Sequence, residues 1–299
     1  MRRISQIAAA GLVVASALLT LSTAQAAGAN GKGGGTVLNH DNNASIGGNI
    51  KYHGGPVIQG AVNVYLIWYG NWAGNTAVAI TEDLVRGLGG SPYMGINTTY
   101  GGNPGRVRCS NAYNLSGEYT DSYSQGSNLS DTGVFNVVNS AITGGHLPKD
   151  TNAVYFVLTS EDVNETGGFC TSYCGWHTYG TVSGSTVQYS FVGNPARCLS
   201  SCAWQSTISP NNNPGADGMA SILAHELEEA QTDPTLTAWF DNIGQENADK
   251  CAWTFGTTYD PGNGSVANMK LGARDYLIQQ NWSKPQGLTQ ACALGYTGP

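Results

Sequence analysis

The sequence predicts an α+β protein that has one mixed β-sheet, packed helices, many loops and disulfide bonds. Three observations lead to this fold class. Short runs that are dense in β-branched and aromatic residues alternate with longer runs that have helical spacing. Glycine, asparagine, serine and threonine dominate the connections, because charged residues make up only 11% of the chain. Seven cysteines lie downstream of an N-terminal export pattern.

The first 26 residues have the pattern of a secretory signal peptide, which we expect to be removed. Two arginines precede an apolar run over residues 8–21, and an Ala-Gln-Ala site ends at residue 26. The apolar run is shorter than the about 20 residues that a membrane-spanning helix needs. The sequence therefore predicts a secreted, extracellular protein. It has a flexible leader rich in glycine and asparagine over residues 27–49 and a single globular domain over residues 50–299.

The first half of this domain is predicted to contain one buried strand and two helices. Residues 62–69 (VNVYLIWY) are rich in β-branched and aromatic side chains and are followed by a glycine, which is typical of a buried strand. Residues 76–88 have helical spacing and are followed by a Gly-Gly pair. A weak alternating stretch occurs at residues 117–123. Residues 131–142 are then expected to form a helix that is capped by Asp131.

The second half is predicted to contain two strong strands and a longer helix. Residues 153–159 (AVYFVLT) and 187–192 have the composition of buried strands. Asp217 is expected to cap a helix that ends just before Pro234, which cannot continue it. The rest of the chain is rich in loops, with one more strand-like run at residues 275–280.

The mature chain is predicted to be acidic. The full sequence has a net charge of −7, and loss of two arginines with the signal peptide changes this charge to −9. A chain with this charge and no basic stripe does not attract nucleic acid or anionic lipid. The sequence therefore argues against nucleic-acid and membrane partners, and it favours an extracellular protein or a cell-wall glycan as the substrate.

The cysteines are expected to form disulfides in an oxidising compartment. Six of the seven cluster after residue 169, whereas Cys109 stands alone and is the candidate for the unpaired thiol. Two similar units, Cys-x3-Cys-Gly-Trp at 170–176 and Cys-x3-Cys-Ala-Trp at 198–204, flank the strand at 187–192. A metal site made from these four cysteines and His177 is an alternative that oxidation disfavours.

The segment that points to chemistry is the helix predicted after Asp217. On a helical wheel its apolar residues share one arc, and Glu226 falls inside that arc. Glu229 and His225 lie at the edge of the arc, whereas Glu228 is expected to face water. A buried carboxylate without a partner is strongly unfavourable, so the inward groups require a compensating charge or hydrogen bonds.

His225 and Glu229 are four residues apart, which is the spacing by which one helix presents two ligands to one metal ion. Glu226 would then lie beside the metal, where it could act as the general base on a bound water. The pattern His-Glu-x-x-Glu differs by one residue from the zinc-binding His-Glu-x-x-His helix. Zinc is therefore the expected metal, and the larger share of oxygen ligands makes manganese, iron or calcium an alternative.

A third metal ligand has to come from another segment. Residues 242–251 contain Glu246 and Asp249, which would share one face if this turn is helical. Glu246 is the favoured ligand, with Asp249 either behind it or in its place. Asp233 and Asp241 are weaker candidates, and Asp233 is better explained as part of the turn before the following proline.

Ordinary roles compete with a metal site. His225 could form hydrogen bonds within the core, and Glu226 and Glu229 could pair with lysine or arginine. The chain has only 13 such basic residues, which favours the metal. Among the other histidines, His53 is expected in a structural turn, and His177 is left open as a ligand or a substrate-facing residue. Tryptophans are expected mostly in the core, and exposed ones would suit carbohydrate stacking.

Several blocks of this sequence resemble the exordium family, also called the phosphate-induced protein family. Residues 51–72 (KYHGGPVIQGAVNVYLIWYGNW) are similar to the opening block of that family. The Cys-x3-Cys-Gly-x-His block at 170–177 resembles its middle. The Cys-x3-Cys-Ala-Trp unit at 198–204, Pro-Asn-Asn at 210–212 and Gly-Ala-Asp-Gly-Met at 215–219 resemble its later block. The resemblance covers most of the mature chain.

This resemblance implies a secreted protein with one shared domain architecture. Plant members are extracellular and associated with growth and cell expansion, with no settled biochemical activity. Their pattern lacks the His-Glu pair that this chain has at His225 and Glu226, so the chain resembles a microbial relative with a zincin-like helix. The order of the elements, with this helix after the sheet, also resembles the zincin layout.

Two hypotheses follow from the sequence. The first is a secreted, metal-dependent, peptidase-like hydrolase in which His225, Glu229 and Glu246 hold zinc and Glu226 activates water. The alternative is a non-catalytic extracellular protein of the exordium type, which acts in growth or signalling or binds a cell-wall polysaccharide, with a structural metal or none. The two hypotheses differ in whether the ligands converge on one point that a substrate can reach.

Overall fold

The computed structural model describes residues 48–101, 108–284 and 289–298. The predicted signal peptide and all but the end of the predicted leader lie outside these ranges, so both stay predictions, as does the division of the chain at residue 50. Within the described ranges, none of the helices combines the length and the apolar character that crossing a bilayer requires.

The core is a five-stranded mixed sheet in the order β3-β2-β5-β8-β7. The first four of these strands run parallel, and β7 pairs antiparallel with β8 at one edge. The bounds are Val62–Tyr69 for β2, Tyr113–Asp121 for β3, Ala153–Thr159 for β5, Gly175–Val182 for β7 and Ser185–Gly193 for β8. Every residue of β5 is buried, because this strand is central and both faces of the sheet are covered. The predicted mixed sheet is confirmed.

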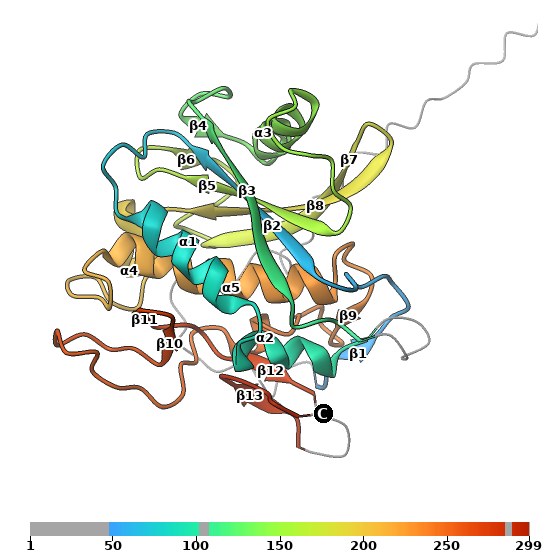
Figure 1. Ribbon diagram of the computed structural model, residues 1–299, viewed down its shortest axis with the longest axis vertical. Helices are drawn as coiled ribbons and strands as arrows, with labels where there is room; N and C mark the ends of the chain where they lie inside the picture. The colour runs from blue at the N-terminus through green and yellow to red at the C-terminus, as the bar shows by residue number, and fades with distance from the viewer. Residues whose placement is uncertain (1–47, 102–107, 285–288, 299) are drawn as a thin grey trace, which may run out of the picture.

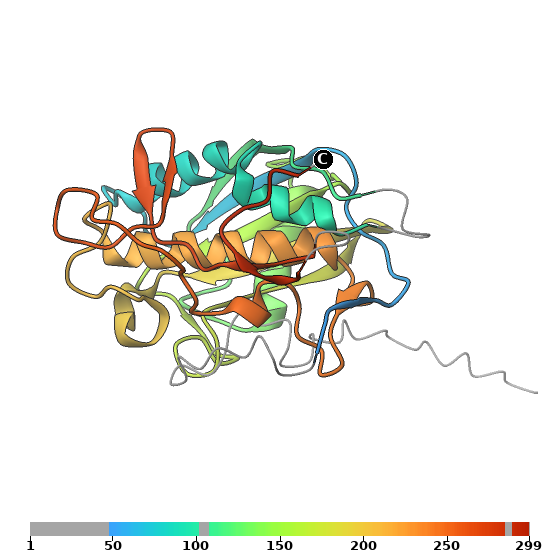
Figure 2. The same ribbon diagram turned by 90° about the horizontal axis from the view of Figure 1, so that it is seen from below.

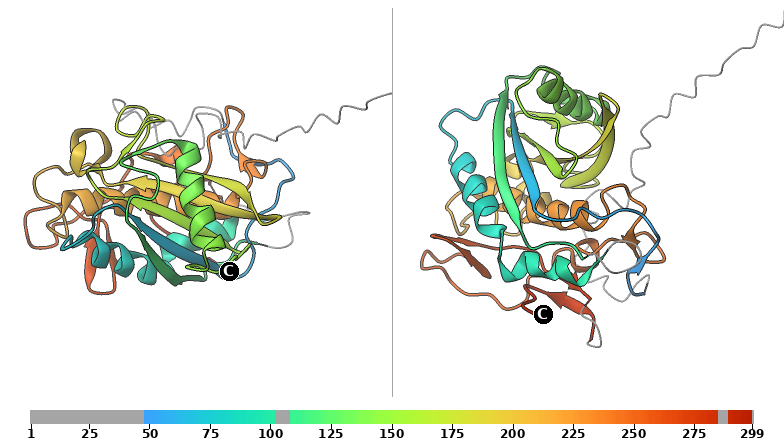
Figure 3. Two further views of the ribbon diagram at one scale, coloured as in Figure 1. Left: turned by 90° about the horizontal axis from the view of Figure 1, so that it is seen from above. Right: turned by 45° about the vertical axis from the view of Figure 1, so that its right-hand side comes forward.

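Helices cover both faces of this sheet (Figure 1). Helix α3, Asp131–Thr143, lies on one face, whereas α1, Ala77–Leu88, and α5, Pro214–Thr232, lie together on the other. The C-terminal part of the chain runs across the far side of α5 (Figure 2). Figure 3 shows the same layers from two further directions. Helix α5 is therefore enclosed, and every residue from Gly215 to Thr232 is buried.

Short elements complete the fold around these layers. Four two-stranded pairs form, β1 with β9, β4 with β6, β10 with β11 and β12 with β13. The short elements are β1 Lys51–Tyr52, α2 Pro92–Gly95, η1 Ile96–Thr99, β4 Asn128–Leu129, β6 Asn164–Glu165, η2 Pro195–Arg197, α4 Leu199–Cys202, β9 Trp239–Phe240, η3 Asp249–Cys251, β10 Met269–Leu271, β11 Arg274–Tyr276, β12 Asn281–Ser283 and β13 Ala291–Ala293.

The predicted apolar strands are confirmed as β2, β5 and the centre of β8, and the weak alternating stretch belongs to β3. The sequence does not predict β7, because its residues, GWHTYGTV, include two glycines and no continuous apolar run. The strand-like run at residues 275–280 overlaps only the end of β11. Apolar composition thus predicts the central strands of the sheet, whereas the polar edge strand β7 can be identified only from the three-dimensional structure.

Two helix caps differ from the prediction. Ser130, not Asp131, caps α3, because its side chain accepts a hydrogen bond from a backbone N–H in the first turn. Helix α5 begins earlier than predicted, at Pro214, with Asn213 as its cap. Asp217 therefore lies within the first turn of α5. In both helices a polar residue further upstream takes the capping position.

Three disulfides join the described segments. They are Cys170–Cys198, Cys174–Cys202 and Cys251–Cys292. Cys109 is buried and free, as predicted. The alternative metal site made from the four clustered cysteines is wrong, because all four are oxidised in pairs. Three disulfides fit an oxidising, extracytoplasmic compartment.

Candidate metal centre

The predicted motif lies on the enclosed helix α5. His225, Glu226 and Glu229 have no exposed surface. Apolar residues on more than one side of the helix, such as Leu223 and Leu227, belong to the hydrophobic core. Because α5 packs between the sheet and the C-terminal segment, its polar side chains have no bulk water to face. Each of them has to find its partner inside the protein.

Three side chains converge near the C-terminal end of α5. Nε2 of His225 lies 3.1 Å from Oε1 of Glu229 and 3.6 Å from Oδ1 of Asp249. The backbone N–H of Asp249 donates to the same Glu229 oxygen, with an N···O distance of 3.0 Å. One ligand atom from each of the three residues lies within 4.8 Å of the others. The structure therefore brings His225 and Glu229 together with the substitute ligand Asp249.

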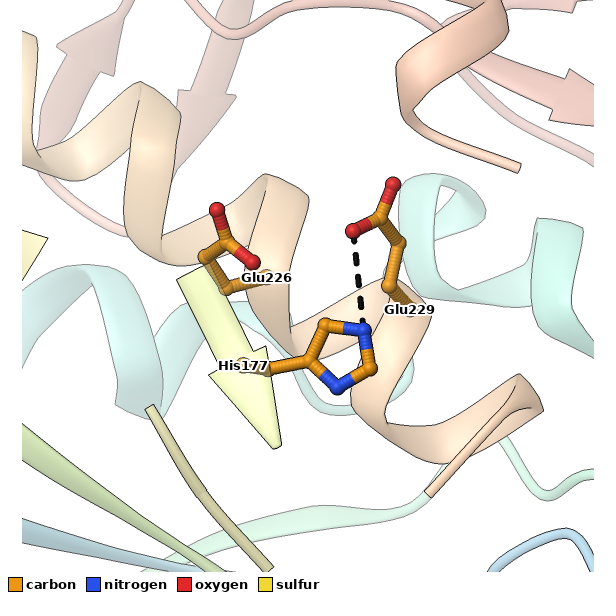
Figure 4. A group of neighbouring side chains, drawn as sticks. All are labelled: His177, Glu226 and Glu229. Atoms are coloured by element: carbon orange, nitrogen blue, oxygen red, sulfur yellow. Dashed lines mark ion pairs between the residues drawn. The ribbon is translucent and has the colours of Figure 1, made fainter. Parts of the chain in front are cut away.

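A second histidine approaches Glu229 from the edge of the sheet. His177 lies on β7, and its Nε2 is 3.1 Å from Oε2 of Glu246 and 3.7 Å from Oε2 of Glu229. Glu226 is also close, because one ligand atom each from His177, Glu226 and Glu229 lie within 4.8 Å. Figure 4 shows these three side chains, with the ion pair between His177 and Glu229 dashed. Glu246 therefore contacts His177 directly, and His177 in turn lies next to Glu229.

We call the six residues His177, His225, Glu226, Glu229, Glu246 and Asp249 the His–carboxylate cluster. A well-ordered turn supplies its last two members. Within this turn Asp241 accepts two backbone hydrogen bonds and pairs with Nζ of Lys250 at 3.0 Å, with both side chains buried. The N–H of Glu246 donates to Oδ2 of Asp249. Asp233 likewise accepts backbone hydrogen bonds in the turn after α5. Asp233 and Asp241, the weaker ligand candidates, are therefore turn residues.

Burial and neighbouring charges act in opposite directions within the cluster. Burial raises the pKa of Glu229, and Asp249 raises it further, whereas His225 and His177 lower it. Burial and the surrounding carboxylates hold the pKa of Glu246 well above its usual range. Burial lowers the pKa of His177 to about 4. For His225 burial acts in the same direction, but the carboxylates, Glu229 foremost, outweigh it and raise the pKa.

The His–carboxylate cluster is closed to solvent. The exposed fraction is 0% for His177, His225, Glu226 and Glu229, 2% for Glu246 and 9% for Asp249. A catalytic metal keeps one coordination position open to water and substrate. A surface pocket does line α5, but it lies further toward the N-terminus of the helix and includes Trp204, Trp253 and Phe255. The cluster can hold a cation or share protons, whereas Glu226 presents no surface to a large substrate.

Glu228 contradicts the helical-wheel prediction, because it is buried and does not face water. It lies near Tyr93, Tyr100 and Tyr113, whose pKa values burial raises and the negative charge of Glu228 raises further. Burial raises the pKa of Glu228 itself well above the usual range. Neither of its carboxyl oxygens has a hydrogen-bond partner within the described ranges. A helical wheel assumes that one side of the helix faces solvent, whereas the enclosed helix α5 has no solvent-facing side.

His177 is the member of the cluster that the sequence left open as a ligand or a substrate-facing residue, without placing it beside α5. Its place depends on β7, which the sequence does not predict, so its approach to α5 could not be deduced. The available signal was the Cys-Gly-Trp-His block, which a disulfide at Cys174 fixes at the start of the strand. His53 stacks on Phe240, and His146 is exposed.

Comparison with known proteins places most of the chain in one family. The region described as "Phosphate-induced protein 1 conserved region" matches residues 50–284. Protein EXORDIUM-like 3 of Arabidopsis thaliana is 31% identical over 277 residues, which cover 78% of this chain and 80% of that protein. Protein EXORDIUM of the same plant is 28% identical, covering 71% of this chain and 76% of its own length.

A relative from a second plant shows the same extent of similarity. Protein PHOSPHATE-INDUCED 1 of Nicotiana tabacum is 26% identical, covering 71% of this chain and 75% of that protein. No solved structure matches the chain, so the zincin-like layout stays a prediction. The match over residues 50–284 and the 31% identity agree with the resemblance of the sequence blocks. The chain therefore belongs to the phosphate-induced protein family, together with the exordium proteins.

Proposed function

We propose that this chain is a non-catalytic extracellular binding protein of the exordium type and that its ligand is a neutral cell-wall glycan. The observation that carries the proposal is the closure of the His–carboxylate cluster. A metal-dependent hydrolase has to bring its substrate to the metal and to the general base. Glu226, the only base that the motif offers, has no exposed surface. Chemistry on a wall polymer or a protein substrate is therefore disfavoured at this site.

The surface pocket beside α5 supports a glycan as the ligand. Trp204 is 49% exposed, and its ring centroid lies 5.1 Å from that of Phe255. Trp253 and the polar side chains of Gln205 and Asp217 complete much of the lining. Sugars present apolar ring faces as well as hydroxyls, so an exposed tryptophan beside polar groups suits them. The negative net charge of the chain favours a neutral glycan over an acidic one.

Disulfides lie in or next to two segments that line this pocket, which favours binding without a large ordering cost. One wall begins at Cys202, which is disulfide-bonded to Cys174. Another wall contains Trp253, two residues after the disulfide-bonded Cys251. Trp253 has a positive φ of 60°, an uncommon conformation for a bulky residue that its surroundings have to maintain. The exposed ring of Trp204, two residues after the disulfide-bonded Cys202, therefore offers a sugar a held aromatic surface.

Retention on insoluble glycans tests the proposal. The mature protein is incubated with cellulose, xylan and chitin, and the bound fraction is measured as a function of protein concentration. Trp204→Ala should weaken retention roughly tenfold, since loss of an aromatic contact costs about 1–1.5 kcal/mol. Tyr179→Ala is the matched control, because Tyr179 is 38% exposed on β7 and does not line the pocket. Equal retention of both variants, or no retention of the wild type, would contradict glycan binding at this pocket.

A metal-dependent hydrolase is the second candidate, because His225, Glu229 and Asp249 converge with Glu226 nearby. Casein hydrolysis by the wild type and by Glu226→Gln separates the two functions. A hydrolase should lose activity by roughly a hundredfold or more in the variant, the usual contribution of a general base. That result would overturn the non-catalytic proposal. Absence of activity in the wild type would remove the hydrolase.

A further inference from the structure

We infer that the His–carboxylate cluster holds one divalent transition-metal ion, bound by His225, Glu229 and Asp249, as a structural centre. In this arrangement His177 and Glu246 are not ligands. They hold the second oxygen of Glu229 on the side of the sheet. The inference does not rest on the proposed glycan binding, because the cluster and the surface pocket share no residue.

The contacts of His225 are the first argument for a bound metal ion. Its Nε2 lies 3.1 Å from Oε1 of Glu229, yet neither ring nitrogen of His225 has a hydrogen-bond partner within the described ranges. The two atoms are therefore close without pointing at each other. Ligands that bind one ion at about 2.0–2.2 Å lie roughly 3–3.6 Å apart and point at a common third position. The distances of 3.1 Å to Glu229 and 3.6 Å to Asp249 fall at these values.

The contacts of His177 explain why this histidine is not assigned as a ligand. Its Nε2 forms a hydrogen bond with Oε2 of Glu246 at 3.1 Å, so the nitrogen that faces the cluster is already engaged. The same nitrogen lies 3.7 Å from Oε2 of Glu229. Glu229 therefore turns one oxygen toward His177 and the other toward His225 and Asp249. This orientation leaves Oε1 on the side where the cation is inferred.

The charge of the cluster is a second, independent argument for a bound metal ion. Four carboxyl groups are buried around two imidazoles. Within the described ranges Glu229 and Glu246 have histidines as their only basic partners, and the nearby Lys250 pairs with Asp241. Buried carboxylates are costly unless a positive charge or hydrogen bonds compensate them. A divalent cation supplies this charge at the point where the ligand atoms converge.

The donor set indicates the class of cation. One imidazole nitrogen with two carboxylate oxygens suits zinc or manganese. Calcium takes six to eight oxygen ligands, and an imidazole is not among its usual donors. A closed site also indicates how the ion enters. Because the cluster has almost no exposed surface, the ion would be captured as the chain folds, and it would fasten α5 to the turn that carries Asp249.

The metal content of purified variants tests the inference. Protein expressed with added zinc and purified without chelator is analysed by mass spectrometry for zinc, manganese and calcium. The wild type should carry one zinc or manganese ion per chain, and Glu229→Gln should lose at least nine-tenths of it. Glu228→Gln is the matched control, since it removes a neighbouring buried carboxyl outside the cluster and should retain the ion. Calcium in place of zinc or manganese, or equal metal in all three proteins, would overturn the inference.

A second measurement keeps the test valid if Glu229→Gln fails to fold. Native wild-type protein is incubated with a chelator, and another sample is unfolded with its disulfides intact and refolded with or without zinc. The native protein should keep its ion for hours, because the site is closed. Protein refolded without metal should melt roughly 5–10 °C lower than protein refolded with zinc, the shift expected of a tightly bound ligand. Identical melting temperatures would exclude a structural ion.

Discussion

The two sides of helix α5 bury acidic side chains in unlike surroundings. Toward β7, Glu229 lies between two histidines and close to Asp249. On the adjoining side, Glu228 lies near a set of tyrosines and has no hydrogen-bond partner for its carboxyl group within the described ranges. Burial raises the pKa of both glutamates. Burial is thus common to the two sides, and convergence of several donor atoms on one point distinguishes the candidate site.

This difference has a simple physical meaning. A single buried carboxyl group can remain protonated and neutral, which removes most of the cost of its burial. Several carboxyl groups around two imidazoles would have to hold several protons in one small volume. One divalent cation can replace those protons, because it compensates two carboxylate charges and binds several ligand atoms at once. The comparison therefore predicts that the two sides of α5 respond differently to mutation, pH and metal.

The largest expected effect comes from releasing the turn that supplies Glu246 and Asp249. Lys250→Met removes one partner of a fully buried ion pair and leaves the charge of Asp241 in the interior. Such a change should lower the free energy of unfolding by about 3–5 kcal/mol. It should also reduce metal content, because the turn no longer holds Asp249 in place. Urea denaturation followed by fluorescence measures the first effect.

Lys270→Met is the control for this prediction. Lys270 is 64% exposed and lies 3.9 Å from Asp275, so its loss should change the unfolding free energy by less than about 0.5 kcal/mol. If both variants had the same stability as the wild type, the turn would not be anchored by the buried pair. The buried ion pair between Lys250 and Asp241 would then not explain how Glu246 and Asp249 are held beside α5.

The sequence predicted much of the cluster but not its environment. His225, Glu226 and Glu229 were found from their spacing, because one helical turn is a local property. Glu246 and Asp249 were found as acidic residues in a later turn, although which of them approaches His225 depends on the fold. His177 could not be placed, because the edge strand that carries it has no apolar run. Local patterns thus identify ligand types, and tertiary packing decides which ligands meet.

The same limit explains the error at Glu228. A helical wheel assigns sides from composition and assumes that the side with a charged residue faces water. The segment near this side lies before α5 and includes α2 and η1, which are only four residues long each. Such short elements leave little periodicity to read. The centre of the sheet, in contrast, was predictable because β2 and β5 are continuous apolar runs.

A pH series sharpens the comparison at the level of single carboxyl groups. The folded pKa of Glu228 is raised above its unfolded value, so the folded protein binds the proton more tightly than the unfolded chain does. This contribution is fully present below the unfolded pKa and is lost as pH rises toward the folded pKa, at up to about 1.4 kcal/mol per pH unit. Glu228→Gln removes this loss. The variant should therefore gain stability relative to the wild type as pH rises from about 5 to 8.

Unfolding free energies of the two proteins at several pH values measure this difference directly. Titrating groups that lie far from Glu228 cancel to a first approximation because they are present in both proteins. A difference that stays constant between pH 5 and 8 would mean that Glu228 is not held protonated by its surroundings. The two sides of α5 would then be more alike than the structure indicates.

The smallest expected effect concerns Cys109, which lies on the same side of α5 as Glu228. Its thiol is buried, and burial and the charge of Glu228 raise its pKa, so it should react with iodoacetamide only after unfolding. Cys109→Ala removes one buried sulfur atom and should cost about 1 kcal/mol, with no change in metal content. Intact mass after alkylation should show one modified cysteine per unfolded chain, because the other six form disulfides. Loss of metal in Cys109→Ala would instead show that the two sides of α5 are coupled through the helix, because no atom of Cys109 belongs to the cluster.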